Sequence, residues 1–299
     1  MRILLVGCGD IALRTARLLR HKARLYGITR RTEDAARLRA HGVVPVIADL
    51  DRLDSLRRVP STPFGVLHFA PPPGDGRDDP RTKRLIAALA RARSIPRRFV
   101  YISTSGVYGD CAGARIDERR PRRAGTPRAQ RRAYAEDLLR AWAARHRVHL
   151  AILRSPGIYS GTRLPLERLR QGSPVLGSDE DVFTNHIHAD DLARAVVAAL
   201  FRGLPNRAYN VTDDAEMKMG AWFDAVADAF HLPRPPRVTW EEAEHRMAPL
   251  LLSFMSESRR LSNDRMKREL RLRLRYPTPQ HLLGQIARRD LKKQLALPI

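Results

Sequence analysis

The sequence predicts an α/β fold built on a doubly wound parallel sheet, with a smaller C-terminal lobe that binds substrate. Short apolar runs alternate with segments of helical periodicity up to residue 153, which is the rhythm of β-α-β units. The first apolar run, residues 2–6, leads at once into a glycine turn and then a helical segment at 13–19. Beyond residue 213, short helical stretches are separated by prolines. Together these observations predict a sheet of the Rossmann type followed by a separate lobe.

The glycine turn after the first strand predicts a binding site for the phosphates of a dinucleotide. It has the form G-x-G-x-x-A, in which Gly7 allows the tight turn and Gly9 lets the backbone approach a pyrophosphate. Ala12 is small enough for the helix to pack closely on the strand. The phosphates would lie on the free N–H groups that begin the helix. The expected contacts are Gly7, Gly9, Asp10, Ile11 and Ala12. A tight strand–helix turn also has structural uses, so the interpretation depends on the strand before it and the helix after it.

The end of the second strand, residues 24–28, indicates which dinucleotide is bound. Arg30 and Arg31 follow this strand, and no acid stands at its end. A carboxylate there favours NAD, whereas an arginine accommodates the 2′-phosphate of NADP. We therefore expect NADP in preference to NAD.

The remaining elements complete the expected sheet and its cofactor edge. Asp49 and Leu50 close the third strand where an adenine ring could lie, and the fourth strand runs into Ala70, Pro71 and Pro72, which should also contact the cofactor. The other expected helices are 32–40, 80–93, 164–171 and 192–200, with one more running through Leu139 and Trp142 after a basic loop at 113–132; the expected strands are 43–47, 64–70, 98–102, 148–153, 183–188 and 208–211. We expect a dinucleotide-binding domain at 1–212, with an excursion into the substrate lobe at about 156–181, and a mostly helical lobe at 213–299.

The composition limits which partners and which cellular location we expect for the protein. The formal net charge is +23, but arginine is spread over the whole chain and no nucleic-acid-binding module is visible, so we do not expect nucleic acid as a partner. The two cysteines, Cys8 and Cys111, suggest neither a disulfide framework nor a zinc site. The apolar stretch 195–201 is far too short to span a bilayer, and no signal peptide precedes the first strand. We expect a cytoplasmic protein without a membrane segment or a metal, and a homodimer is compatible with this.

Later motifs resemble the short-chain dehydrogenase/reductase superfamily, and in particular its extended branch of nucleotide-sugar epimerases and dehydratases. Besides the glycine turn, the resemblance rests on the segments 49–50, 102–109, 154–159, 185–193, 209–211, 258–263 and 276–278. It covers nearly the whole chain and implies the fold already expected, with NAD(P) as cofactor.

The chain departs from that resemblance where the family has its catalytic Tyr-x-x-x-Lys pair. If Glu136 is the glutamate that commonly follows, Arg132 stands in place of the lysine and Arg128 in place of the tyrosine. In the alternative register Tyr134 is the tyrosine, but Leu138 then replaces the lysine. The cation normally lowers the phenol pKa so that the phenol exchanges a proton near neutral pH. Neither register provides that pair.

Other residues are candidates for the chemistry. Thr104 matches the family hydroxyl that bonds the substrate oxygen, although it could equally satisfy local backbone, and Tyr108 is a candidate replacement acid. Part of an arginine cluster beside the expected cleft could hold an anionic substrate; it comprises Arg119, Arg120, Arg122, Arg123, Arg128, Arg131 and Arg132. His186 and His188 could be read as a metal pair, but a structural role is favoured because no third ligand stands at a recognisable spacing. Cys8 is favoured as a small filler of the turn.

These expectations combine into one function and one alternative. The leading expectation is an NAD(P)-binding oxidoreductase or epimerase/dehydratase-like protein with an atypical site, acting on an anionic or sugar-nucleotide-like substrate. The alternative is a sensor or regulatory protein that binds NADP without catalysis.

Overall fold

A parallel sheet forms the centre of the computed structural model, which describes residues 1–59, 64–91 and 95–295. In these residues seven strands lie in the order β12-β7-β5-β4-β1-β2-β3, and every neighbouring pair is parallel. The strands are β1 (Arg2–Val6), β2 (Arg24–Thr29), β3 (Val43–Ile47), β4 (Gly65–His68), β5 (Arg98–Thr104), β7 (His149–Ser155) and β12 (Arg207–Asn210). The order reverses between β1 and β4, which is the point where doubly wound sheets bind ligands.

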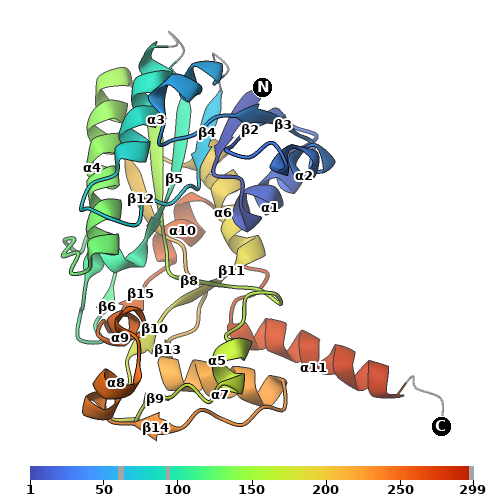
Figure 1. Ribbon diagram of the computed structural model, residues 1–299, viewed down its shortest axis with the longest axis vertical. Helices are drawn as coiled ribbons and strands as arrows, with labels where there is room; N and C mark the ends of the chain where they lie inside the picture. Colours follow the sequence, from blue (N-terminus) through green and yellow to red (C-terminus); the bar gives the residue numbers. More distant parts are fainter. Residues whose placement is uncertain (60–63, 92–94, 296–299) are drawn as a thin grey trace.

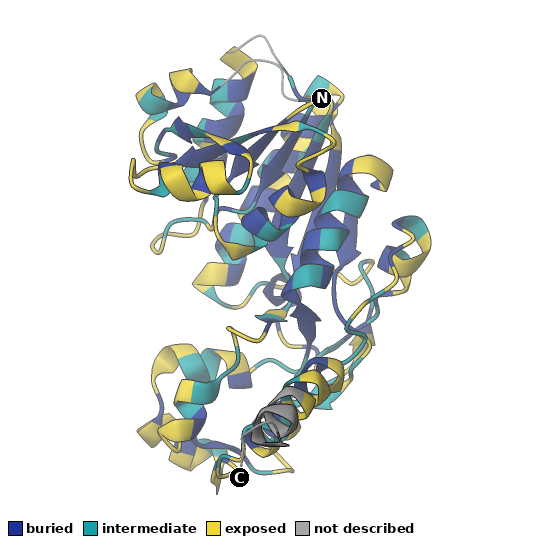
Figure 2. Cartoon of the chain, turned by 90° about the vertical axis from the view of Figure 1, so that its right-hand side faces the viewer, coloured by how far each residue is buried: buried dark blue, intermediate teal, exposed yellow. Residues whose placement is uncertain are grey.

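The sheet is buried on both faces because its strands are apolar on both sides. Along β1, Ile3 and Leu5 point into one core, and Leu4 and Val6 into the other; all four are fully buried. Helices α1 (Asp10–Leu19), α2 (Asp34–Ala40), α6 (Ala189–Arg202) and α10 (Asp264–Glu269) cover the first face. Helices α3 (Pro80–Arg91) and α4 (Pro127–His146), with the 3-10 turn Leu53–Arg58, cover the second. This layering confirms the predicted fold class (Figures 1 and 2).

A third hydrophobic cluster lies beyond the carboxyl ends of the strands. It joins Tyr159, Leu169 and Leu176 to the later helix α7, through Trp222 and Phe223. The helices here are α5 (Leu166–Arg170), α7 (Met219–Ala229), α8 (Trp240–Arg246), α9 (Pro249–Met255) and α11 (Pro279–Leu295). Short paired strands connect them, namely β8 (Gly157–Tyr159) with β11 (His186–His188), β9 (Val175–Leu176) with β14 (Arg237–Val238), and β10 (Phe183–Thr184) with β13 (Met217–Lys218). Figure 1 shows this smaller lobe below the sheet, with α11 extending from it.

One segment after residue 213 leaves the smaller lobe before α11 returns to it. Strand β15 (Arg260–Leu261) pairs with β6 (Arg115–Ile116). Met266, Leu270 and Leu272 then join the core on the first face of the sheet. The segment 260–272 therefore packs on the larger unit, and the predicted boundary at residue 213 remains a prediction for the rest of the chain.

Several elements differ from the sequence-based expectation: the predicted strand 183–188 is two short strands, β10 and β11, and the predicted helix 192–200 is the longer α6. Helix α4 begins at Pro127, inside the predicted loop 113–132, because the Thr126 hydroxyl caps it by accepting from the Ala129 N–H at 3.3 Å. Helix α1 begins at Asp10 rather than at residue 13. The last two residues of the predicted helix 80–93 lie outside the described residues. Among the residues described, no helix is both long and apolar enough to cross a membrane.

Candidate functional site

The glycine turn is fixed by contact with the end of β4. Gly7 has φ +88°, and a Cβ there would lie 2.5 Å from the Ala70 backbone nitrogen, so only glycine fits without strain. Gly9, in contrast, has φ −80° and nothing within 4 Å of its Cβ position. Gly9 precedes α1, and no side chain caps the helix start. The turn thus leaves open space in front of uncapped N–H groups, which fits a phosphate.

The turn opens into a cavity of about 460 Å³ along the ends of β1, β2 and β3. Eight of the predicted cofactor residues line it, namely Gly7, Gly9, Arg30, Arg31, Asp49, Leu50, Ala70 and Pro71. Asp10, Ile11 and Ala12 belong to the first turn of α1 and do not line it. Pro72 lines a second cavity. The structure therefore brings most of the predicted set together around one hollow.

Sequence reasoning missed an acid in this cavity. Asp34, the first residue of α2, accepts hydrogen bonds from Arg31 Nε at 3.3 Å and Arg37 Nη2 at 3.1 Å. Its carboxylate thus offsets part of the positive charge that Arg31 brings. Arg81 of α3 also lines the cavity and is held by Asp51 at 2.7 Å. An acid in the first turn of the second helix was visible in the sequence, but its spacing from the strand end gave no reason to place it here.

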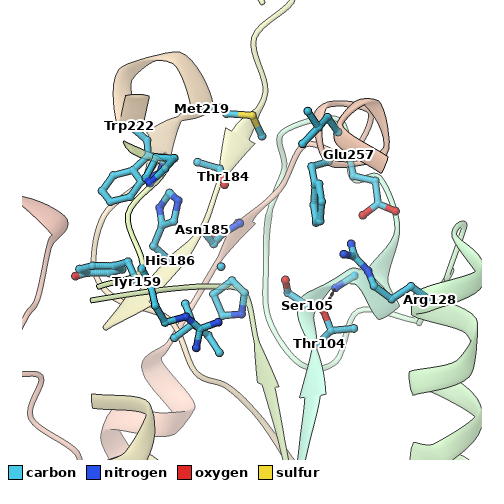
Figure 3. A pocket seen from close by; sticks show the side chains of 18 of the residues that line it. Thr104, Ser105, Arg128, Tyr159, Thr184, Asn185, His186, Met219, Trp222 and Glu257 are labelled. Atoms are coloured by element: carbon cyan, nitrogen blue, oxygen red, sulfur yellow. Dashed lines mark hydrogen bonds between the residues drawn. The ribbon is translucent and has the colours of Figure 1, made fainter. Parts of the chain in front are cut away.

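A larger cavity of about 790 Å³ lies between the carboxyl end of β5 and the smaller lobe. Figure 3 shows Thr104 and Ser105 on its floor, Arg128 and Glu257 on one side, and Trp222 and His186 on the other. Pro71, at the end of β4, lines both this cavity and the smaller one. The two hollows therefore meet at the switch point of the sheet.

The positions expected for the catalytic pair face this larger cavity. Arg128 and Arg132 both line it, whereas Tyr134 does not and is 38% exposed. Arg132 Nη1 donates to the Ile102 carbonyl at 2.7 Å and to the Tyr101 hydroxyl at 3.2 Å. The geometry thus favours the register that puts arginines at both positions.

Glu136, which defines that register, lies behind the cavity in an ion-pair network. It is fully buried and accepts from Ser103 Oγ at 2.6 Å and Arg154 Nη2 at 2.7 Å. A paired carboxylate of this kind holds α4 against β5 and β7, so Glu136 acts as an anchor rather than as a reacting group.

Of the two predicted catalytic residues, Thr104 lines the larger cavity and Tyr108 lies outside it. Thr104 lines the larger cavity, and its Oγ1 also accepts from the Gly106 N–H at 3.2 Å. Tyr108 is 1% exposed and does not line the cavity. Its hydroxyl donates to Asn210 Oδ1 at 2.7 Å and accepts from Arg154 Nη1 at 2.9 Å. Burial raises the Tyr108 pKa to about 12. This position argues against the predicted role of Tyr108 as the acid.

Three other titratable groups besides arginine line the larger cavity in the described part of the chain: Glu257, His186 and Tyr159. Glu257 is paired with Arg259 Nη1 at 2.8 Å. Burial lowers the His186 pKa to about 4, so this imidazole is neutral at pH 7. None of the three was predicted as a cavity residue, because only the folding of the smaller lobe brings them beside β5.

The larger cavity is lined mainly by positive charge. Among the described residues that line it, six are arginines (Arg128, Arg131, Arg132, Arg163, Arg168 and Arg259), and Glu257 is the single carboxylate. Three of them belong to the arginine cluster noted in the sequence. Of the rest of that cluster, Arg119 pairs with Asp117 and Arg122 with Asp137.

The contacts of the remaining candidates, His188 and Cys8, indicate structural roles. His188 Nδ1 accepts from the Asp190 N–H at 3.2 Å, which caps α6, and its ring stacks on Tyr276. In the part of the chain that the structure describes, no three histidines, cysteines or acids gather as a metal site. Burial raises the Cys8 pKa to about 12, which keeps its thiol protonated and unreactive.

Known proteins that are similar to this chain support the resemblance seen in the sequence. The model of the NAD dependent epimerase/dehydratase family matches residues 13–212. The mouse dTDP-D-glucose 4,6-dehydratase is 24% identical over 187 residues, a match that covers 48% of this chain and 53% of that protein. The human counterpart is 25% identical over 146 residues, covering 46% of this chain and 41% of that protein. The match thus spans about half the length of these relatives or less.

Solved structures resemble the chain over nearly its whole length. A protein of unknown function from Silicibacter pomeroyi superposes with a TM-score of 0.81 at 28% identity, covering 97% of this chain and 99% of that one. The dTDP-glucose 4,6-dehydratase from Streptomyces venezuelae, solved with NAD bound, gives a TM-score of 0.78 at 19% identity, covering 98% of each chain. The UDP-glucose 4-epimerase from Thermotoga maritima, solved with UDP-glucose, gives 0.77 at 15% identity, covering 98% of this chain and 100% of that one. At such identities the last two show a shared fold.

Proposed function

Because the chain belongs to the NAD-dependent epimerase/dehydratase family, we propose that it is an atypical oxidoreductase or epimerase-like enzyme that binds a nicotinamide dinucleotide and acts on an anionic substrate. One observation carries this proposal. The cavity at the glycine turn and the arginine-lined cavity meet at Pro71, on the carboxyl edge of the parallel sheet. A dinucleotide laid along this edge has room for its adenosine in the first cavity and reaches the substrate in the second.

The residues of the smaller cavity fit such a cofactor. The open space at Gly9 and the uncapped start of α1 would receive the pyrophosphate. Arg30 and Arg31 would face the 2′ position of the adenosine ribose, which supports NADP over NAD. Asp34 offsets part of that charge and so reduces the expected preference. When bound, the dinucleotide supplies a hydride donor or acceptor.

The residues of the larger cavity then hold the substrate and handle the proton. Thr104 is placed to donate to a substrate oxygen, and Arg128 and Arg132 hold negative charge near it. Arginine keeps its proton at all ordinary pH values, so these side chains bind and orient but do not exchange protons. Glu257 is the one carboxylate among the described residues of this cavity; we assign it the role of proton acceptor, with its ion pair to Arg259 holding it in position.

Turnover tests this function directly. NADPH oxidation and NADP⁺ reduction are to be followed with a panel of ketones and alcohols, in which each anionic compound has an uncharged counterpart. We expect turnover with anionic members only. Glu257→Gln should lower that rate by about a hundredfold or more, the usual worth of general acid–base help, and leave NADPH affinity unchanged. Turnover that ignores substrate charge would contradict the proposal.

A further inference from the structure

Two arginines in the larger cavity each lie closely over a phenylalanine ring. The Arg128 guanidinium of α4 lies over the ring of Phe254 of α9, 4.3 Å from the ring centroid. The Arg168 guanidinium of α5 lies over the ring of Phe223 of α7, at 4.5 Å. Stacking of this kind fixes the plane of a guanidinium group and leaves its N–H edge free for an oxyanion.

Neither guanidinium forms an ion pair with a described residue of the cavity, although the nearby Glu257 carboxylate acts to raise the Arg128 pKa. Glu257, its single described carboxylate, is paired with Arg259 rather than with Arg128 or Arg168. Nε and Nη2 of Arg168 are buried and have no hydrogen-bond partner among the described residues. Burial also lowers the pKa of both guanidinium groups. Burying unpaired nitrogens is costly, so the Arg168 position favours an anionic ligand, and the exposed Arg128 side chain offers its charge to the same cavity.

The two arginines belong to different walls of the cavity. Figure 3 shows Arg128 on one side and Trp222 on the other. Phe223, on which Arg168 stacks, follows Trp222 in α7 and lines the same cavity. Each wall thus carries one stacked guanidinium, with the floor at Thr104 between the walls.

We propose that the substrate is a small dianion with an oxyanion group at each end, one bound by Arg128 and the other by Arg168. The inference rests on the proposed function, because it names the substrate class of the same cavity. Carboxylate and phosphate share the planar, bidentate match to arginine, so either group serves at each end. A sugar nucleotide differs because its charge lies in the middle, between two uncharged ends.

Calorimetric titration of the full chain tests this with defined probes. The dianions are succinate, glutarate and adipate, and the comparison compounds are butyrate and UDP-glucose. We expect at least one dianion to bind about tenfold more tightly than butyrate, since hydrogen bonds to a charged group add that much. Equal binding of dianions and butyrate, or tighter binding of UDP-glucose than of every dianion, would overturn the inference.

Variants assign the two ends. Arg128→Met and Arg168→Met keep an apolar contact with the phenylalanine but remove the charge, and each should erase the preference for dianions. Arg145→Gln on α4 and Arg170→Gln on α5 are matched controls, because both side chains are exposed and outside the cavity. They should keep the full preference. A preference that survives both methionine variants, with melting temperatures unchanged, would refute the assignment.

NADPH affinity, measured by nicotinamide fluorescence in the same samples, separates this inference from the function on which it rests. Dianion binding without NADPH binding would refute the proposed function alone. NADPH binding without any dianion preference would refute this inference alone.

Discussion

Replacing Gly9 with valine isolates cofactor binding from folding. The backbone at Gly9, with φ −80°, suits any residue, and its Cβ position has nothing within 4 Å. The valine therefore fits the protein, but it fills the space that a pyrophosphate needs in front of α1. Two charge-assisted hydrogen bonds, each worth about 1.5–3 kcal/mol, would be lost. The dissociation constant of NADPH should then rise by about a hundredfold or more.

Gly7→Ala is the matched contrast in the same turn. Its Cβ would lie 2.5 Å from the backbone nitrogen of Ala70, so β1 and β4 would have to move apart. This variant should lose stability, whereas Gly9→Val should melt within a few degrees of the unmodified chain. Thermal unfolding measures the first effect, and calorimetric titration with NADPH measures the second. Unchanged NADPH affinity in a folded Gly9→Val variant would refute the assignment of the turn.

Three further predictions concern the cofactor, the network behind the cavity and pH. NADP(H) should bind about tenfold more tightly than NAD(H), because one charge-assisted contact to the 2′-phosphate contributes about that much. The double variant Arg30→Ala with Arg31→Ala should remove this difference in affinity. Equal affinities in the unmodified chain would refute the prediction. Tyr108→Phe should lower the free energy of unfolding by about 1–3 kcal/mol in denaturant titrations, because the buried Asn210 and Arg154 each lose a hydrogen bond. The same variant should leave turnover nearly intact. A large loss of turnover at full stability would restore Tyr108 as the acid. Burial raises the Asp213 pKa from 3.8 to about 8. Between these two pH values the native state therefore keeps a proton on Asp213 that the unfolded state has lost. Stability should fall as pH rises through this range, by up to about 1.4 kcal/mol per pH unit, and Asp213→Asn should flatten the slope; an unchanged slope would contradict this.

The sheet and the phosphate turn were predictable because their causes are local. Alternating apolar runs specify strands, and the glycine spacing specifies the turn. The larger cavity was less predictable because its walls come from segments far apart in the sequence. Glu257 and His186 reach Thr104 only through the packing of the smaller lobe. Tyr108 illustrates the limit, since its sequence position beside Thr104 says nothing of the bonds to Asn210 and Arg154 that bury its hydroxyl.

The central claim is that one nicotinamide dinucleotide lies along the carboxyl edge of the sheet. Calorimetric titration of the unmodified chain with NADPH, and in parallel with NADH, tests it most directly. The account predicts saturable binding of one dinucleotide per chain. Titrations in which neither NADPH nor NADH binds to a folded chain would contradict it.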